Sequence, residues 1–274
     1  MFNILLSHFT PCSFLFFLVG IIIGSFLNVV IHRYPLMLRQ QWDLDYHMLT
    51  TGTISEQDTL TLSVPRSHCP HCLHTLRVYD IIPVLSWLLL KGKCRDCGIP
   101  ISRRYPLVEL LTGGMFLAAS MVWTESHWSV AVMALSALLI AGSMIDLDYH
   151  WLPDFFTQSV LWMGISLAWA GVSPLDLHQA VSGALVGYLS FLCIRGASSL
   201  LMKQEALGMG DVWLFAGIGT WVGWMDLTYV ALTASVTGLG CGLCAGKMSG
   251  HMAFGPFLGM GGLGVIFYQG MFPG

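Results

Sequence analysis

The hydrophobic residues of this chain are gathered in long runs that are separated by shorter polar segments. A helix needs roughly 20 apolar residues to cross about 30 Å of hydrocarbon. Runs close to that length occupy 11–31, 106–123, 128–145, 155–172, 179–195, 211–225, 228–246 and 254–272. The pattern therefore predicts an all-α polytopic membrane protein with about eight transmembrane helices.

The first of these runs could be mistaken for a secretory signal. Residues 1–10 contain no Lys or Arg, and the run "PCSFLFFLVGIIIGSFLNVVI" that follows has 21 residues. A cleavable signal has a basic front end and a shorter apolar core. We therefore expect this segment to be a retained spanning helix.

The polar segment after the first run predicts the orientation of the chain. Nine of the twelve Lys and Arg residues lie within 32–106, and cytoplasmic loops are enriched in these residues. With this segment in the cytoplasm, the N-terminus faces outward and three later turns are cytoplasmic, around 146–154, 196–210 and 247–253. The other three basic residues lie on those turns or at their margins: Arg195, Lys203 and Lys247.

This topology divides the chain into three segments. Residues 1–34 hold the first transmembrane helix, 35–105 form a cytoplasmic loop, and 106–274 form a seven-helix membrane core. Within the loop, residues 40–63 are polar and lack a clear period, so we expect a flexible or loosely folded insert there.

The composition supports the membrane class. The chain is 55% hydrophobic and 10% charged, with a mean hydropathy of +0.70. Soluble domains usually carry about 25% charged residues. The net charge of -3 gives no reason to expect a nucleic-acid partner, so the lipid bilayer is the first predicted partner.

Four cysteines of the cytoplasmic loop have the spacing of metal ligands. Cys69, Cys72, Cys94 and Cys97 form C-x2-C, 21 residues, C-x2-C. Two such pairs complete a tetrahedral sulfur cage for zinc. Disulfides are the poorer alternative in a reducing cytoplasm, and a redox role or four unrelated thiols are the others. Four cysteine ligands leave no open coordination position, so the predicted zinc is structural.

Two aspartates stand at the ends of apolar runs. Asp146 closes "AVMALSALLIAGSMID", and Asp211 follows Gly208 and Gly210 in "GMGD". The predicted topology places both at the cytoplasmic face, although 65 residues separate them. Acids at a helix boundary are often only interfacial, but ionisable groups at membrane depth are functional candidates. The glycines give the backbone freedom to bring another chain close.

Such a pair permits two functions. Two carboxylates within hydrogen-bond reach share a proton, so that one can activate a water while the other polarises a carbonyl. That is peptide hydrolysis of the aspartic-protease kind. A proton-coupled transporter could use two interfacial aspartates as a relay. The pattern of residues by itself leaves both open.

Longer motifs are spread over nearly the whole chain: "GSFLNVVIHRYP" at 24–35, "SWLLLKGKCRDCGIPISRRYPLVELLTG", "MIDLDYHWLPD", "GMGD" and "FGPFLG" at 254–259. Together with the cysteine loop they resemble the type IV prepilin leader peptidases of bacterial pilus assembly and type II secretion. More distantly, the Gly-x-Gly-Asp element resembles the intramembrane aspartyl proteases of the presenilin type.

The resemblance implies that Asp146 and Asp211 are the catalytic pair, with Gly208 and Gly210 in support and with Asp148 and Asp154 in structural roles. It implies cleavage of prepilins or pseudopilins after a short basic leader, at the cytoplasmic face of the bacterial inner membrane. It also implies methylation of the new N-terminus by S-adenosylmethionine, for which no residues are assigned.

One departure from the family pattern concerns the environment of Asp211. The family often has a lysine two residues after this aspartate, where this chain has Trp213. A nearby ammonium favours the ionised form of a carboxylate, so Lys203 or another cation would have to replace it. The favoured function is nevertheless the aspartic endopeptidase; the transporter and a non-cleaving pilin-binding assembly factor are the alternatives.

Overall fold

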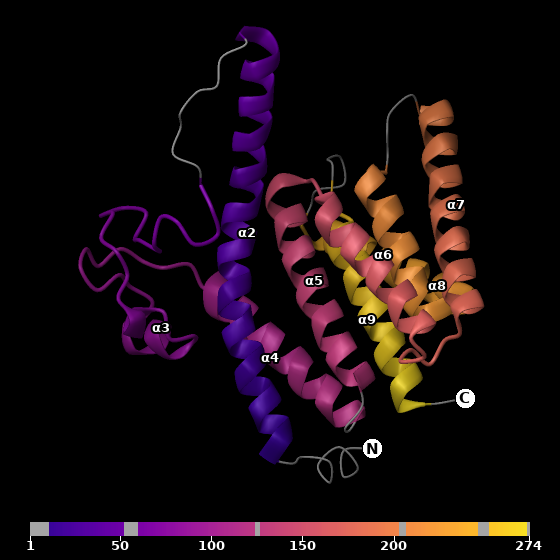
Figure 1. The fold of residues 1–274 in the computed structure, drawn as a ribbon, viewed down its shortest axis with the longest axis horizontal. Helices are drawn as coiled ribbons and strands as arrows, with labels where there is room; N and C mark the ends of the chain where they lie inside the picture. The colour runs from indigo at the N-terminus through magenta and orange to yellow at the C-terminus, as the bar shows by residue number, and fades with distance from the viewer. Residues whose placement is uncertain (1–10, 52–59, 124–126, 203–206, 246–251, 273–274) are drawn as a thin grey trace. The chain divides into compact units, whose positions relative to one another are not determined.

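The computed structural model describes residues 11–51, 60–123, 127–202, 207–245 and 252–272 (Figure 1). These residues form long helices, and within them no strand appears beyond two isolated β-bridges. The elements are α2 (Pro11–Thr51), the 3-10 helix η1 (Val78–Asp80), α3 (Leu85–Leu89), α4 (Arg104–Val122), α5 (His127–Tyr149), α6 (Asp154–Trp169), α7 (Leu177–Met202), α8 (Met209–Ala245) and α9 (Gly255–Met271). The predicted all-α class is confirmed.

The helices agree roughly with the eight predicted spans. Among the described residues, five helices are long and apolar enough to cross a membrane: α2, α4, α5, α7 and α8. Helices α6 and α9 have 16 and 17 residues. Helix α8 is broken at Gly223, where φ is 78° and ψ is 166°, a conformation that glycine adopts readily because it lacks a Cβ. Its two arms correspond to the predicted runs 211–225 and 228–246.

The chain divides into two compact units, with the boundary inside α4 between Leu117 and Ala118. The first unit contains α2, the cysteine loop, α3 and most of α4, and the second contains α5 to α9. This division is based on contacts between residues. The predicted segments 1–34, 35–105 and 106–274 are instead defined by which parts of the chain cross the membrane and which lie in the cytoplasm. Those segments therefore stay a prediction.

In the first unit, glycines allow α2 and α4 to approach closely. A Cβ at Gly20 would lie 2.8 Å from the Cα of Gly113, and one at Gly24 would lie 2.7 Å from the Cα of Glu109. Small residues at such crossings are a common way to pack helices in a membrane, where backbone approach replaces hydrophobic burial as the source of contact.

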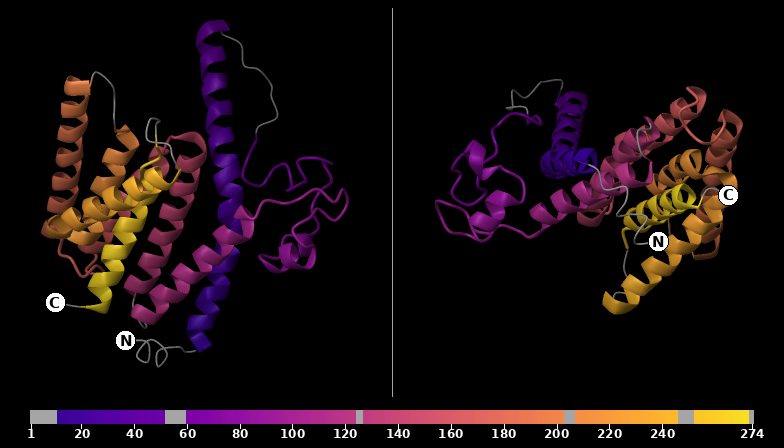
Figure 2. Two further views of the ribbon diagram at one scale, coloured as in Figure 1. Left: turned by 180° about the vertical axis from the view of Figure 1, so that it is seen from behind. Right: turned by 90° about the horizontal axis from the view of Figure 1, so that it is seen from below.

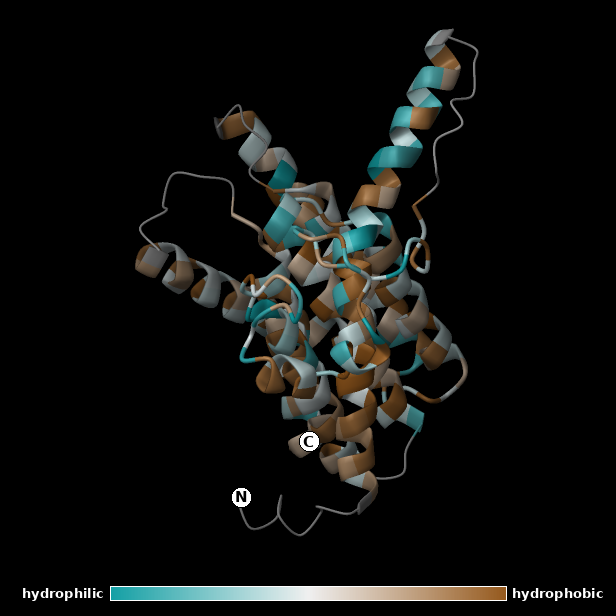
Figure 3. Cartoon of the chain, turned by 90° about the vertical axis from the view of Figure 1, so that its left-hand side faces the viewer, coloured by the Kyte–Doolittle hydropathy of each residue, from teal (hydrophilic) through white to brown (hydrophobic). Residues whose placement is uncertain are grey.

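Helix α2 is longer than the first predicted span and continues through Pro35 to Thr51. The expectation of a loosely folded insert is therefore wrong for residues 40–51. Between Pro35 and Thr51 the sequence holds no further proline and no glycine, the two residues that disfavour a helix most. Hydrophilic residues are concentrated on this end of α2 (Figure 3). Residues 52–59 of the insert lie outside the described part of the chain.

The second unit is a bundle in which α8 contacts α6, α7 and α9 (Figures 1 and 2). Its first arm is buried: Val212 and Trp221 are fully enclosed, and the Trp221 indole N–H donates to the carbonyl of Val160 in α6 at 3.0 Å. Its second arm exposes large apolar side chains such as Leu239 and Leu243. Such outward apolar surface suits contact with lipid tails.

The contact between α7 and α8 predicts one sensitive glycine. A Cβ at Gly183 would overlap the carbonyl oxygen of Gly219. We expect Gly183→Ala to lower the unfolding free energy by about 1–3 kcal/mol, because the two backbones must separate. Thermal unfolding of the purified chain in detergent measures this. The control is Gly196→Ala on the same helix, where a Cβ would meet nothing within 4 Å; equal midpoints for the two variants would contradict the prediction.

Candidate active site and metal site

Asp146 lies near the end of α5 and is almost fully buried, with 5% of its surface exposed. Its Oδ2 accepts a hydrogen bond of 2.9 Å from the backbone N–H of Gly255, the first residue of α9. The first N–H groups of a helix have no partner within the helix, so this carboxylate supplies one. Glycine is needed there, because a Cβ on Gly255 would lie 2.7 Å from Oδ2.

Asp211 lies in the first turn of α8. The structure explains why Gly208 and Gly210 precede it. The backbone N–H of Gly208 donates to the Asp211 carboxylate. Gly210 faces Leu152, in the connection between α5 and α6, and a Cβ there would lie 3.1 Å from the Leu152 carbonyl oxygen. Gly210 thus lets α8 begin directly against the segment that follows α5.

The structure brings the two predicted carboxylates together. The charges of Asp146 and Asp211 are close enough to interact. The end of α5 and the starts of α8 and α9 lie at the same end of the bundle (Figures 1 and 2). An arrangement of this kind places two carboxylates, each held by a backbone N–H, where they can exchange a proton with a water or a carbonyl.

The polar residues around the pair differ in their placement. Asp148 and Asp154 are exposed, and Asp154 begins α6 directly after Pro153. Trp213 packs its ring against Tyr188 of α7, with centroids 4.8 Å apart. Lys203, the candidate replacement for the family's lysine, lies outside the described residues.

Two neighbours of Asp146 were missed in the sequence analysis. Gly255 is 109 residues away, and only the "FGPFLG" motif hinted at its importance. The imidazole of His150 also interacts with the charge of Asp146. Its spacing of four residues from Asp146 is the spacing at which side chains on a helix are neighbours, and this signal could have found it.

The four loop cysteines form two similar turns in the first unit. The N–H of Cys69 donates to the carbonyl of His74, and the N–H of Leu73 donates to that of Cys69. The second turn repeats this arrangement, from Cys94 to Ile99 and from Gly98 to Cys94. The two C-x2-C pairs therefore fold into turns with the same backbone hydrogen bonds, as expected for two matching halves of one metal site.

The sulfur positions fit a tetrahedral ion. The Sγ atoms of Cys69, Cys72, Cys94 and Cys97 all lie within 4.8 Å of one another, and those of Cys69 and Cys97 are 3.8 Å apart. Zinc–sulfur bonds of about 2.3 Å in a tetrahedron give sulfur separations of about 3.8 Å. Backbone N–H groups of Cys72 and His71 lower the pKa of the Cys69 thiol to about 6, which favours its thiolate, whereas burial and the neighbouring thiols raise the pKa of Cys97 to about 12.

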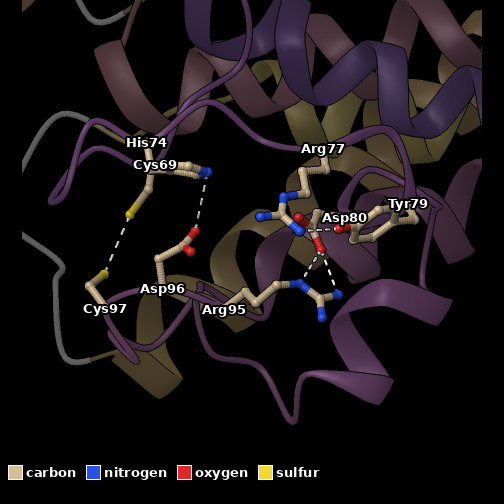
Figure 4. Close-up of polar contacts among 8 residues, drawn as sticks. All are labelled: Cys69, His74, Arg77, Tyr79, Asp80, Arg95, Asp96 and Cys97. Atoms are coloured by element: carbon tan, nitrogen blue, oxygen red, sulfur yellow. Dashed lines mark hydrogen bonds and ion pairs between the residues drawn. The ribbon is translucent and has the colours of Figure 1, made fainter.

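Side chains connect the two turns around the cysteines (Figure 4). His74 of the first turn lies 3.7 Å from Asp96 of the second. Arg95 binds Asp80 at 2.7 Å and lies over the ring of Tyr79, 5.0 Å from its centroid. The hydrogen bond to Asp80 raises the pKa of Arg95, so the guanidinium keeps its charge. The cysteine cluster is thus supported by contacts that do not themselves need a metal.

Comparison with known proteins finds two family models that match the chain. The family model "Bacterial Peptidase A24 N-terminal domain" matches residues 18–123, and "Type IV leader peptidase family" matches 133–243. No solved structure matches the chain.

Three curated relatives cover nearly the whole chain. A type 4 prepilin-like proteins leader peptide-processing enzyme of Escherichia coli O78:H11 is 55% identical over 92% of this chain and 93% of its own length. Prepilin leader peptidase/N-methyltransferases of Burkholderia pseudomallei (strain 1026b) and Aeromonas hydrophila are 41% and 40% identical, over 91% and 94% of this chain and 83% and 91% of their own lengths. The chain therefore belongs to the type IV leader peptidase family.

Proposed function

We propose that this protein is an aspartic endopeptidase that removes the short basic leader from type IV prepilins or pseudopilins and N-methylates the new terminus. The observation that carries the peptidase is the meeting of Asp146 and Asp211 at one end of the helical bundle. The relatives' names supply the substrate class and the second activity. The transporter alternative finds no support in these comparisons.

The chemistry follows from two carboxylates that share one proton. The ionised carboxylate takes a proton from a water, whose oxygen attacks the carbonyl carbon of the scissile bond, while the protonated carboxylate donates to the carbonyl oxygen. The tetrahedral intermediate then collapses, the C–N bond breaks, and a proton passes to the leaving amine. The N–H groups of Gly208 and Gly255 hold the two carboxylates in position for these steps.

The position of the pair suits a substrate with a polar leader and an apolar helix. The site lies where spanning helices begin and end, so a leader could stay in water while the following helix remains in lipid. The concentration of Lys and Arg in residues 32–106 supports a cytoplasmic location for this face, since cytoplasmic loops carry these residues. We therefore place the active site at the cytoplasmic face of the bacterial inner membrane.

The cysteine cluster is proposed to hold one structural zinc. Four thiolates complete the coordination of zinc and leave no position for a reacting water. Cys69, Cys72, Cys94 and Cys97 would hold the ion and thereby fix the two turns of the loop, without taking part in hydrolysis.

The methyl transfer rests on the relatives' names. S-adenosylmethionine is a nucleoside-bearing ligand, and ligand cavities of that class have several hundred Å³. The cavity lined by Leu139, Gly142, Leu152 and Phe156 has about 10 Å³ and is too small for it. A hollow of about 630 Å³ on α7 is large enough, but its lining is mostly apolar, with His178 and Ser182 as the polar residues. No step is therefore derived through this cofactor, and its residues remain unassigned.

Replacement of either carboxylate tests the peptidase. We expect Asp146→Asn and Asp211→Asn each to lower cleavage of a prepilin in membranes by about 10²- to 10⁴-fold, the usual contribution of general acid–base catalysis. Asp176→Asn is the matched control, because Asp176 is exposed and caps α7 through an oxygen that asparagine also has. Normal cleavage by both active-site variants, at equal amounts of protein, would remove the catalytic assignment.

A second variant tests the position of Asp146 without changing its charge. Gly255→Ala places a methyl group against Oδ2, so the carboxylate must move. We expect a loss of about 10²-fold in the cleavage rate, because a shift of about 1 Å at a reacting group can cost that much. Gly264→Ala on the same helix meets nothing within 4 Å and should cleave normally. Equal rates for the two variants would show that this contact does not position the carboxylate.

Elemental analysis tests the metal. We expect about one zinc per chain, and loss of that zinc in Cys94→Ser, because a four-cysteine site needs every thiolate. The variant should also show faster proteolysis of the loop, while Cys193→Ser, outside the cluster, should keep its zinc. A zinc content near zero in protein with all four thiols reduced would reject the cage.

A further inference from the structure

An apolar surface on the cysteine loop is explained neither by the metal site nor by the carboxylates. Residues 81–90, "IIPVLSWLLL", contain no charged residue. Leu85, Leu88 and Leu89 share one face of α3 by their spacing, and they are 58%, 60% and 77% exposed. Ile81 and Ile82 directly before α3 are also exposed. Contiguous exposed apolar surface of this kind marks an interaction site. These five residues are the α3 patch.

The position of the α3 patch relative to the membrane follows from the contact between the start of α3 and the spanning helix α4. The N–H of Val84, the residue before α3, donates to Oε2 of Glu109 in α4 at 2.7 Å. The same glutamate packs its backbone against Gly24 of α2. Helix α3 therefore begins beside α4, and Figure 1 shows it near the level at which α4 begins.

The length of α4 shows how deep in the membrane the contact between Val84 and Glu109 lies. Its 19 residues span about 28 Å, so nearly all of α4 is needed to cross about 30 Å of hydrocarbon. Glu109 is five residues from the start of α4 and therefore lies about 7.5 Å inside its end. Interfacial helices bury their apolar face about 5–10 Å into the boundary between headgroups and acyl chains. The start of α3 lies at that depth.

The opposite side of α3 is attached to the loop, which orients the patch outward. The indole N–H of Trp87 donates to the carbonyl of Ile101 at 3.2 Å, and its ring packs against Gly92 so closely that a Cβ there would lie 2.8 Å away. Val84 has a φ of 59°, which is unfavourable for a β-branched residue. The bond from its N–H to Glu109 holds α3 in this orientation.

Charge at the end of the segment complements a lipid surface. Lys91 and Lys93 follow the apolar residues directly and are exposed. Lysine side chains can extend from an apolar surface to the headgroup region, where they attract anionic lipids. The sequence thus combines an uncharged apolar face with a basic edge, which is typical of a segment that lies in the interface.

We propose that residues 81–90 are embedded in the leaflet at which α4 begins, with the α3 patch in contact with acyl chains and with Lys91 and Lys93 at anionic headgroups. The bilayer is the partner of this surface. The attachment through Glu109 then holds the cysteine loop at the membrane surface, independently of the peptidase chemistry.

Photocrosslinking of the full chain in vesicles of phosphatidylethanolamine and phosphatidylglycerol tests the embedding. A photoreactive phenylalanine analogue is placed at Leu89 and, in separate variants, at Tyr46 and Leu185. Tyr46 is exposed near the polar end of α2 and serves as the control in water, and Leu185 is exposed on spanning helix α7 and serves as the control in lipid. We expect position 89 to form phospholipid adducts at a level similar to position 185. We expect no phospholipid adduct at position 46.

Two outcomes would overturn the proposal. An adduct level at 89 equal to that at 46 would place the patch in water. A crosslink from 89 to an added prepilin, in place of the phospholipid adduct, would make the patch a substrate surface. The zinc content of each variant reports whether the loop has folded, and position 88 replaces 89 if the zinc is lost.

The basic edge is tested by Lys91→Gln combined with Lys93→Gln. We expect the phospholipid adduct at 89 to decrease in vesicles that contain phosphatidylglycerol and to stay unchanged in vesicles of phosphatidylcholine alone. An unchanged adduct in both kinds of vesicle would overturn the headgroup contact.

Discussion

The hydrogen bond between the N–H of Gly255 and the carboxylate of Asp146 is the interaction on which the candidate active site depends. A helix that begins in a poorly hydrated region must find partners for its first N–H groups. Here the partner is a side chain from α5, so the start of α9 and the end of α5 are joined through the carboxylate of Asp146. The contact of Gly210 with Leu152 brings the start of α8, and with it Asp211, to the same place. The acidic pair is therefore positioned by backbone contacts.

The bundle supports this arrangement through the two unlike arms of α8. The arm that carries Asp211 is enclosed by α6, α7 and α9 and is fastened by the bond from Trp221 to Val160. The arm beyond Gly223 exposes apolar residues that suit lipid. Because the break at Gly223 separates these two environments, the first arm can pack as a protein core while the second remains a membrane span. The candidate carboxylate Asp211 thus lies on the enclosed arm.

The cysteine loop has a different physical basis, since it is organised by short turns and few buried side chains. Backbone hydrogen bonds close the two turns that carry the four sulfurs, and the contact of His74 with Asp96 joins one turn to the other. Helix α3 is attached to α4 through Glu109. A metal at the cysteines and lipid at α3 would both restrict the motion of this loop.

The sequence by itself determined the features that depend on local composition. Apolar runs predicted the all-α membrane class, because transfer of a segment into lipid depends on its own residues. The C-x2-C pairs predicted the sulfur cluster, and the motifs around Asp146 and Asp211 predicted the acidic pair. Tertiary structure alone decided the contact of Gly255 with Asp146 and the contact of Gly210 with Leu152. These contacts depend on which helix surfaces fit against each other, and no short window of sequence contains that information.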